Sequence, residues 1–302
     1  MTVLVATQDP NATAETYVRQ HMRLIAPGAT VGLGLAVSGT APDHLPFLDL
    51  TRRDGGVAGK WRTLSALVRH GATGAPTGAA RAAARAFLRE HDVRVVLAEF
   101  GPTGAALMSL CREADIPMVV NFHGFDATVM PRARLVRHAY ARLAREAAGF
   151  VCGSNHFAGR VVEIGMPEDR IDIVPCGVST EAFAPAADRT GTRVVAVGRL
   201  TAKKAPLEAI RAFGHAHSAC PELTLDMLGG GPLMENCARL VSELGLEAAV
   251  TLHGPQPHEA VRAMLAHGDI FIQHSVVAPN GDTESQGISL IEAMASALPV
   301  VA

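Results

Sequence analysis

The sequence predicts an α/β protein with two Rossmann-like, doubly wound domains in tandem, the second of them incomplete. Its 302 residues are too many for one ordinary core and suit two α/β domains. Short apolar runs alternate with helical patterns in both halves, which is typical of parallel sheets covered on both faces. A stretch rich in Gly, Pro and small residues, 176–192, interrupts this alternation. We therefore assign 1–180 to an N-terminal domain and 181–302 to a C-terminal domain.

The first half contains five strand-like runs among helical patterns. A Gly-, Pro- and Asp-rich stretch at 38–60 predicts a loop, and apolar spacing around Trp61, Leu64 and Leu67 predicts a helix after it. The strands are expected at 2–6, 93–98, 117–121, 149–153 and 171–174, and the remaining helices at 12–26, 80–90, 103–114, 131–147 and 156–164.

The second half repeats this alternation and ends at Pro299-Val-Val-Ala302, as a strand finishes. Because an apolar strand at the end of an α/β domain needs a covering helix, we expect the chain to be a fragment of a longer protein. Ligands in such sheets bind beyond the carboxyl ends of the strands, so the cleft between the domains is the expected site. The strands are expected at 194–198, 223–228, 249–252, 269–273 and 299–302, and the helices at 204–218, 232–244, 257–267 and 287–297.

Composition argues against several classes of function. A formal net charge of −2 gives no electrostatic case for nucleic acid as a partner. The five cysteines and thirteen histidines lack metal-ligand spacing. No basic-then-apolar leader and no long apolar run are present, which predicts a cytoplasmic protein, soluble or peripheral at the membrane. Gly32-Leu-Gly-Leu35 is a weak dinucleotide-loop pattern that lacks the last glycine and a following helix.

The segment Glu284-Ser-Gln-Gly-Ile-Ser-Leu-Ile-Glu292 carries the first candidate site. If a helix begins near Gly287, the amides of its first turn lack intrahelical acceptors and can bind a phosphate or a sugar hydroxyl. Two flanking carboxylates would accept hydrogen bonds from a sugar diol. The alternative is that Glu284 caps the helix and Glu292 is a solvated helix residue.

The second candidate is Gly198-Arg-Leu-Thr-Ala-Lys-Lys-Ala-Pro206, which follows a predicted strand. Arg199 is expected at the carboxyl end of that strand, with Lys203 and Lys204 opening the next helix. Because the helix dipole disfavours cations there, a bound anion such as a diphosphate would explain the pair. The alternative is that both lysines are merely solvated.

Taken in order, these motifs resemble the nucleotide-binding domain of the family 4 glycosyltransferases, which have the two-domain GT-B fold. The first half resembles the acceptor domain of the exopolysaccharide and colanic-acid-type branch of that family. In the second half the motifs are Gly198-Arg-Leu with Lys204-Ala-Pro, Leu228-Gly-Gly-Gly-Pro232, Glu284-x7-Glu292 and the Glu-Ala-Met-Ala run that begins at Glu292. In the first half they are Ala14-Glu-Thr-Tyr17, Phe100-Gly-Pro-Thr-Gly104, Asn121-Phe-His-Gly-Phe-Asp-Ala127 and Ile173-Val-Pro-Cys-Gly-Val178.

The resemblance implies a hexosyltransferase that uses a UDP- or GDP-sugar, retains the anomeric configuration, binds no metal or other cofactor, and acts on a glycan or lipid-linked acceptor. Glu284 and His123 would be catalytic and contact the donor sugar, with His123 facing it across the cleft. The implied donor-binding residues are Arg199 and Lys204 for the diphosphate, Glu292 for the ribose, the amides of Gln286, Gly287, Ile288 and Ser289 beside the sugar, Gly230 near the cleft floor, and Gly254 near the base.

The sequence also departs from the family pattern. Asp9-Pro-Asn-Ala-Thr-Ala-Glu15 replaces a glycine pair found in many members, and Ser285-Gln286 replaces a Gly-aromatic or Gly-Leu pair. On its own His123 would be structural, and Asp126 could orient it or cap a loop. The rival functions are a nucleotide-sugar epimerase or phosphorylase and a non-catalytic binding module.

The stretch 131–147 is rich in arginine, with apolar residues between the arginines. It predicts either a solvated helix packed on the core or a basic patch that contacts anionic lipid. Peripheral contact with the inner face of the plasma membrane is therefore a hypothesis.

Overall fold

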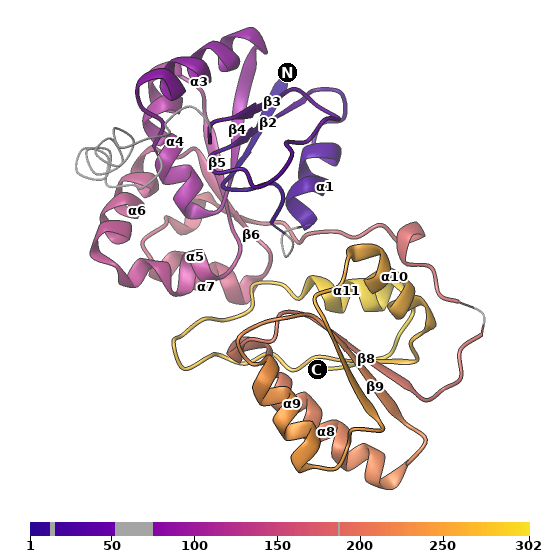
Figure 1. The fold of residues 1–302 in the computed structure, drawn as a ribbon. Coiled ribbons are helices and arrows are strands. Elements are labelled where there is room, and N and C mark those ends of the chain that lie inside the picture. Colours follow the sequence, from indigo (N-terminus) through magenta and orange to yellow (C-terminus); the bar gives the residue numbers. More distant parts are fainter. Residues whose placement is uncertain (13–15, 52–74, 187) are drawn as a thin grey trace. The chain divides into compact units, whose positions relative to one another are not determined.

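The computed structural model describes residues 1–12, 16–51, 75–186 and 188–302. They form two compact units, Met1–Pro175 and Cys176–Ala302. Each unit is a parallel sheet with helices on both faces (Figure 1). The predicted α/β class with two Rossmann-like domains is therefore confirmed. The predicted helix around Trp61 lies outside the described residues.

The sheet of the first unit has the strand order β3-β2-β1-β4-β5-β6-β7. Because β1 pairs with both β2 and β4, the chain winds outward in one direction as far as β3 and in the other from β4 to β7. This reversal makes the carboxyl ends of β1 and β4 the topological switch point. The strands are β1 (Thr2–Thr7), β2 (Thr30–Gly34), β3 (Phe47–Asp49), β4 (Val93–Glu99), β5 (Met118–Phe122), β6 (Gly149–Cys152) and β7 (Ile171–Ile173).

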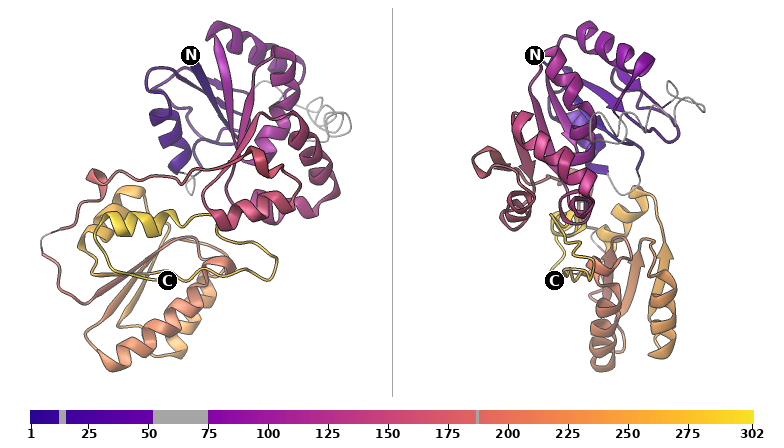
Figure 2. Two further views of the ribbon diagram at one scale, coloured as in Figure 1. Left: turned by 180° about the vertical axis from the view of Figure 1, so that it is seen from behind. Right: turned by 90° about the vertical axis from the view of Figure 1, so that its left-hand side faces the viewer.

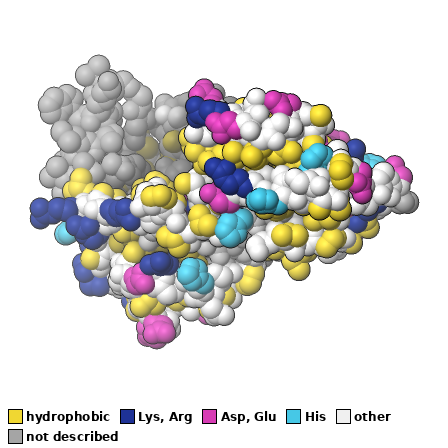
Figure 3. Space-filling view, turned by 90° about the horizontal axis from the view of Figure 1, so that it is seen from below, with side chains coloured by type: hydrophobic (Ala, Val, Ile, Leu, Met, Phe, Trp, Pro, Cys, Tyr) yellow, Lys and Arg dark blue, Asp and Glu magenta, His cyan; other side chains and the backbone are white. Residues whose placement is uncertain are grey.

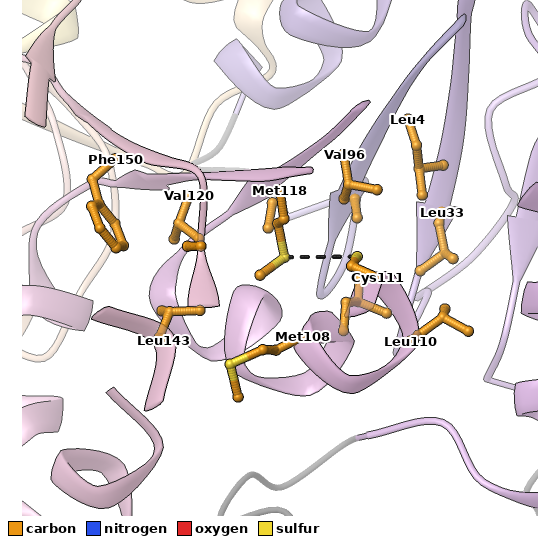
Figure 4. Close-up of a cluster of buried hydrophobic side chains, with 14 of the residues drawn as sticks. Leu4, Leu33, Val96, Met108, Leu110, Cys111, Met118, Val120, Leu143 and Phe150 are labelled. Atoms are coloured by element: carbon orange, nitrogen blue, oxygen red, sulfur yellow. Dashed lines mark hydrogen bonds between the residues drawn. The ribbon is translucent and has the colours of Figure 1, made fainter. Parts of the chain in front are cut away.

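Alternating side chains of β1 serve two cores. Leu4 and Ala6 join the large cluster on one face of the sheet, while Val3 and Val5 pack with Val18 of α1 on the other. Figure 4 shows strand side chains of the large cluster facing residues of α4 and α6. The helices are α1 (Thr16–Leu24), α3 (Gly78–Glu90), α4 (Gly101–Ala114), α5 (Phe125–Thr128), α6 (Arg134–Glu146) and α7 (Asn155–Glu163), with 3₁₀ turns η1 (Met130–Arg132) and η2 (Glu168–Arg170).

Two strands of this sheet contradict the sequence prediction. Gly32 and Gly34 belong to β2, and the predicted loop at 38–60 contains β3. A Cβ on Gly32 would lie 2.4 Å from a ring carbon of Phe47, so the glycine lets β3 pack closely. The glycines thus serve strand packing, which leaves the dinucleotide-loop alternative without support. Their lack of side chains hid the strand periodicity.

The sheet of the second unit has the order β10-β9-β8-β11-β12. Its first strand, β8, lies between β9 and β11, so the switch point is at the carboxyl ends of β8 and β11. The strands are β8 (Arg193–Val197), β9 (Thr224–Leu228), β10 (Val250–Gly254), β11 (Ile270–Ile272) and β12 (Val300–Val301).

The helices of this unit also cover both faces of the sheet. Figure 2 shows helices on opposite sides of this sheet. Val194 and Ala196 pack toward α8 and α9, whereas Val195 packs toward α10 and α11. The helices are α8 (Pro206–Ala219), α9 (Met234–Glu243), α10 (His258–His267) and α11 (Ile288–Ala295), with 3₁₀ turns η3 (Glu181–Phe183) and η4 (Ala202–Lys204).

Candidate functional site

The switch point of the second unit gathers most of the predicted donor-binding residues. Gly198 and Arg199 follow β8 directly, and Gln273 follows β11. Together with Lys204 they line a small open pocket. Arg199 is exposed and, in the described part of the chain, forms no ion pair or side-chain hydrogen bond. Its guanidinium is therefore available to a ligand.

Glycines bring the backbone turns around this pocket into contact. The amide of Gly229 donates to the carbonyl of Gly254 at 2.9 Å, and the amide of Leu200 donates to the carbonyl of Gly230 at 2.9 Å. Gly229 has φ +137°, and a Cβ there would lie 1.9 Å from the carbonyl oxygen of Gly198. The turns after β8, β9 and β10 approach this closely only because side chains are absent. The turn that carries Gly229 and Gly230 thus contacts Gly198 on one side and Gly254 on the other.

Lys204 connects the two motifs singled out from the sequence. Its Nζ lies 2.7 Å from Oε2 of Glu284, and both side chains are mostly buried. When the Gln273 amide is oriented to satisfy both its atoms, its oxygen lies 3.2 Å from Nζ of Lys204 and its nitrogen donates to Oγ of Ser289 at 2.7 Å. Residues some eighty positions apart thus form one polar cluster.

Lys203 contradicts the prediction of a lysine pair facing an anion. Its side chain is buried, its Nζ lies 3.2 Å from Oδ1 of Asp282, and it donates to the carbonyl of Thr283 at 3.4 Å. Its own carbonyl accepts the amide of Val276 at 2.9 Å. Lys203 therefore fastens the loop that carries Glu284. Both lysines also lie on η4, before α8 begins, rather than on the helix itself.

The start of α11 differs in part from the expected anion site. Gly287 is the N-cap residue and no side chain caps the helix, so Glu284 is not its capping acid. In the described structure the amides of Gly287, Ile288 and Ser289 donate to no backbone acceptor. The Gln286 side chain is already engaged, since it accepts from the amide of Cys176 at 2.7 Å and donates to its carbonyl at 3.0 Å.

Glu292 is buried in α11 and is not a solvated helix residue. Nε2 of His258 lies 3.0 Å from its Oε1, and the His258 ring packs edge-on against Phe183. His253, beside Gly254, is paired instead with Asp226 at 2.6 Å. One oxygen of Glu292 is therefore occupied by a histidine that the sequence reasoning missed.

In the first unit, His123 contacts a buried carboxylate. Oε2 of Glu99, at the end of β4, lies 2.6 Å from Nε2 of His123, and Oε1 lies 2.6 Å from Nδ1 of His21. Asn121 donates to Oε2 at 3.2 Å. Burial alone would raise the pKa of Glu99, but hydrogen bonds from His123 and His21 lower it to about 2. The sequence reasoning missed Glu99. The signal that could have found it is a charged residue at the end of a buried apolar strand.

Asp126 holds the loop after β5 rather than the imidazole ring. Its Oδ1 accepts from the amides of His123 at 3.1 Å and Gly124 at 2.9 Å, and its Oδ2 accepts from the amide of Gly101 at 3.0 Å. Of the two roles open from the sequence, the structure supports the loop cap. His123 thus has its backbone fixed by Asp126 and its ring fixed by Glu99.

Two further findings concern the described residues only. Among them, no cluster of three or more His, Cys, Asp or Glu side chains could hold a metal ion. None of their helices is both long and apolar enough to cross a membrane.

Two family models match the chain and together cover residues 50–302. The model described as Glycosyltransferase Family 4 matches residues 50–182, and the model described as Glycosyl transferases group 1 matches residues 179–302. The chain belongs to the family 4 glycosyltransferases. The resemblance found in the sequence is thereby confirmed.

Relatives of this glycosyltransferase chain include two bacterial proteins. The putative colanic acid biosynthesis glycosyltransferase WcaL of Escherichia coli K12 is 32% identical over 213 residues, which are 68% of this chain and 52% of WcaL. The GDP-mannose-dependent alpha-(1-6)-phosphatidylinositol monomannoside mannosyltransferase of Mycolicibacterium smegmatis is 30% identical over 242 residues, 75% of this chain and 62% of the relative. The chain thus spans about half to three fifths of these relatives.

Solved structures agree with the fold of this glycosyltransferase chain. Anabaena Alr3699/HepE in complex with UDP and glucose has a TM-score of 0.74 at 16% identity, covering 100% of this chain and 80% of that protein. Sucrose-phosphate synthase from Thermosynechococcus elongatus has a TM-score of 0.73 at 17% identity, covering 99% and 80%. At such low identity the likeness establishes the two-domain architecture.

Proposed function

We propose that the complete protein transfers a hexosyl group from a UDP- or GDP-sugar to a glycan or lipid-linked acceptor, with retention of configuration. The observation that carries this proposal is the pairing of Lys204 with Glu284 beside the exposed Arg199 at the switch point of the second unit. Cations and a carboxylate at this position suit a ligand that joins a diphosphate to a sugar.

In this proposal Arg199 and Lys204 bind the donor diphosphate and stabilise the charge that the leaving nucleoside diphosphate gathers. The amides from Gln286 to Ser289 add partial positive charge at the start of α11. With these groups supplying the charge, we propose that no metal ion is needed. The free-state pair of Lys204 and Glu284 would open as the diphosphate draws Lys204 away, which releases Glu284 toward the sugar.

The remaining site residues would bind the rest of the donor. The second oxygen of Glu292 accepts from no described residue and would take a ribose hydroxyl. Gly230 and Gly254 would let the nucleotide approach the backbone closely, and His123 would contact the donor sugar. No covalent nucleophile is assigned.

The names of two related proteins support these assignments. The mycolicibacterial relative is named as GDP-mannose-dependent and as acting on a phosphatidylinositol monomannoside. One structural neighbour was solved with UDP and glucose. A nucleoside diphosphate sugar as donor and a lipid-linked glycan as acceptor follow by analogy.

The test is a screen of UDP-, GDP- and ADP-sugars against the full-length protein, by calorimetry and by product analysis with labelled donor. Transfer to an acceptor supports the proposal. An epimerised or phosphorolysed sugar supports the rival enzymes, and absence of binding heat with every donor supports a non-catalytic module. Dialysis against EDTA should leave the transfer rate unchanged.

Two variants test the named residues. Lys204→Ala and Glu284→Gln should each lower kcat about 100- to 1,000-fold, as removal of a charge-stabilising group does elsewhere, while thermal unfolding changes little. Near-wild-type transfer by either variant would remove that residue from the mechanism.

We also propose that α6 contacts anionic membrane lipids. Arg134, Arg137 and Arg145 are exposed on this helix, and Leu135 among them is 51% exposed. Figure 3 views the molecule from below and shows basic side chains, in dark blue, gathered on the left, the side on which α6 lies in Figure 1. Basic and apolar groups together on one helix suit the headgroup region of a membrane.

Liposome co-sedimentation tests this contact. Binding should require anionic lipid and should fall when Arg134 and Arg145 are both changed to Glu. The same charge change at Arg211 and Arg239, which are exposed on α8 and α9, is the matched control. Equal recovery with neutral and anionic vesicles would contradict the proposal.

A further inference from the structure

The carboxylate of Glu99 occupies the switch point of the first unit and is completely buried. Three side chains surround it from two other elements: His21 of α1, Asn121 of β5, and His123 just after β5. Because burial of an unpaired carboxylate is very unfavourable, the three donors are needed to keep it there. Because the pKa of Glu99 is about 2, its carboxyl group is ionised at neutral pH.

An ionised carboxylate only accepts hydrogen bonds, so each imidazole nitrogen that faces it must carry a proton. For His123 that nitrogen is Nε2, at 2.6 Å. When the ring is neutral, Nδ1 is then unprotonated and can only accept. In the described part of the chain, Nδ1 of His123 has no hydrogen-bond partner.

The ring of His123 is also held in place by its neighbours. Its centroid lies 4.6 Å from that of Tyr17 on α1 and 4.6 Å from that of Phe100. Its backbone amide is fixed by Asp126 at 3.1 Å. Neither rotation of the ring nor movement of the loop can therefore exchange the two nitrogens without breaking these contacts.

We propose that Glu99 is a positioning residue that holds His123 in its Nε2–H tautomer and so presents Nδ1 as an acceptor for a hydroxyl of the sugar substrate. The identity of that substrate rests on the function proposed above. Glu99 itself touches no substrate and acts only through His123. An acceptor nitrogen suits a hexose, because its hydroxyls each bring a donor.

Isosteric variants separate the two nitrogens of His123. Gln places its amide nitrogen where Nε2 lies, so His123→Gln keeps the donor to Glu99 and removes the acceptor at Nδ1. Asn mimics the Nδ1 side, so His123→Asn supplies an acceptor there and leaves Glu99 without this donor. His21→Asn keeps a donor to Oε1 of Glu99 and is the control.

The decisive measurement is the tautomer of His123 in full-length protein with ¹⁵N-labelled histidine, read from long-range ¹H–¹⁵N spectra at pH 8.5, where a free imidazole is neutral. The wild type and His21→Asn should show a protonated Nε2 and an unprotonated Nδ1. Glu99→Gln should lose this pattern, because an amide can also donate to Nε2. A protonated Nδ1 in the wild type, or an unchanged tautomer in Glu99→Gln, would overturn the proposal.

A titration with the donor found in the screen then tests the acceptor role. The Nδ1 resonance should shift with the nucleotide sugar and not with the nucleoside diphosphate alone, and His123→Gln should lower kcat/KM about 10- to 100-fold. Binding without a shift at Nδ1 would contradict the acceptor role. If no nucleotide sugar binds, the proposed function fails, while the tautomer measurement still decides the role of Glu99.

Discussion

At the switch point of the first unit, Glu99 is fully buried between two histidines, whereas at the switch point of the second unit Arg199 is exposed and Lys204, though mostly buried, lines the open pocket. Both groups of charges lie at the carboxyl ends of strands where the winding of a parallel sheet reverses. In the first unit the charge is satisfied within the protein, so it fixes the geometry of its neighbours. In the second unit positive charge remains available, which suits a diphosphate.

Lys203 and Lys204, which are adjacent in sequence, show the same difference between a buried charge and a charge that lines a pocket. Lys203 is buried against Asp282 and fastens a loop, while Lys204 points to Glu284 and the pocket. Neighbouring residues of one type thus have different surroundings: Lys203 is fixed in a buried ion pair, and Lys204 lines the pocket. The predictions below test each part of this division, from the largest expected effect to the smallest.

The close approach of glycine turns in the second unit predicts the largest effect. Gly229→Ala should lower the free energy of unfolding by more than about 4 kcal/mol, because the new Cβ would meet a backbone carbonyl at 1.9 Å in a left-handed conformation. Gly245→Ala, also at positive φ but with open space around the Cβ, should cost about 1–2 kcal/mol. Equal loss in urea unfolding of both variants would contradict the role assigned to the glycine turns.

The buried ion pair of Lys203 should be the next most sensitive. Lys203→Met removes the buried ammonium group that contacts Asp282 and the carbonyl of Thr283, and it should lower the free energy of unfolding by about 3–5 kcal/mol. Hydrogen exchange at 276–284 should rise in the same variant. Lys204→Met, the matched change one residue along, should cost about 1 kcal/mol. Equal stability of the two variants would contradict the different roles assigned to Lys203 and Lys204.

Acid unfolding probes the Glu99 cluster. The pKa of Glu99 is lowered from 4.5 to about 2 in the folded protein, so its contribution is complete above pH 4.5 and disappears as pH falls toward 2. The shift corresponds to about 3 kcal/mol. Glu99→Gln should therefore lose less stability than wild type between pH 5.5 and 2.5, a range in which free histidine is already protonated. Parallel pH profiles for the two proteins in urea unfolding would argue against this assignment.

Substitution of Arg199 should give the smallest change in free energy, and the change should be confined to ligand binding. Arg199→Ala should weaken binding of the nucleoside diphosphate about 10- to 30-fold, the loss of one charged hydrogen-bonding group, without changing stability. Arg211→Ala, at an exposed position on α8, is the control. Calorimetry that finds the same affinity in both variants would place the diphosphate elsewhere.

Much of the architecture could be predicted because apolar periodicity is a local property. The strands β8 to β11 and the helices around them lie within a few residues of their expected positions. The strands β2 and β3 were missed because glycines and a short, loop-like segment concealed the alternation. The family motifs assigned Lys204 and Glu284 to one donor site, but their direct ion pair could not be predicted, because the two residues lie far apart in sequence.

The sequence by itself determined that the chain has two α/β units, that Arg199, Lys204, Glu284 and Glu292 carry the motifs of a family 4 glycosyltransferase, and that His123 stands at a strand end. The tertiary structure alone decided how the charges are paired. In the structure Lys203 is buried against Asp282, Glu292 is paired with His258, and Glu99 is enclosed between two histidines. The physical reason is that the partner and the exposure of a charged side chain depend on which strand ends lie next to each other at a switch point. No local pattern in the sequence specifies which strands are neighbours.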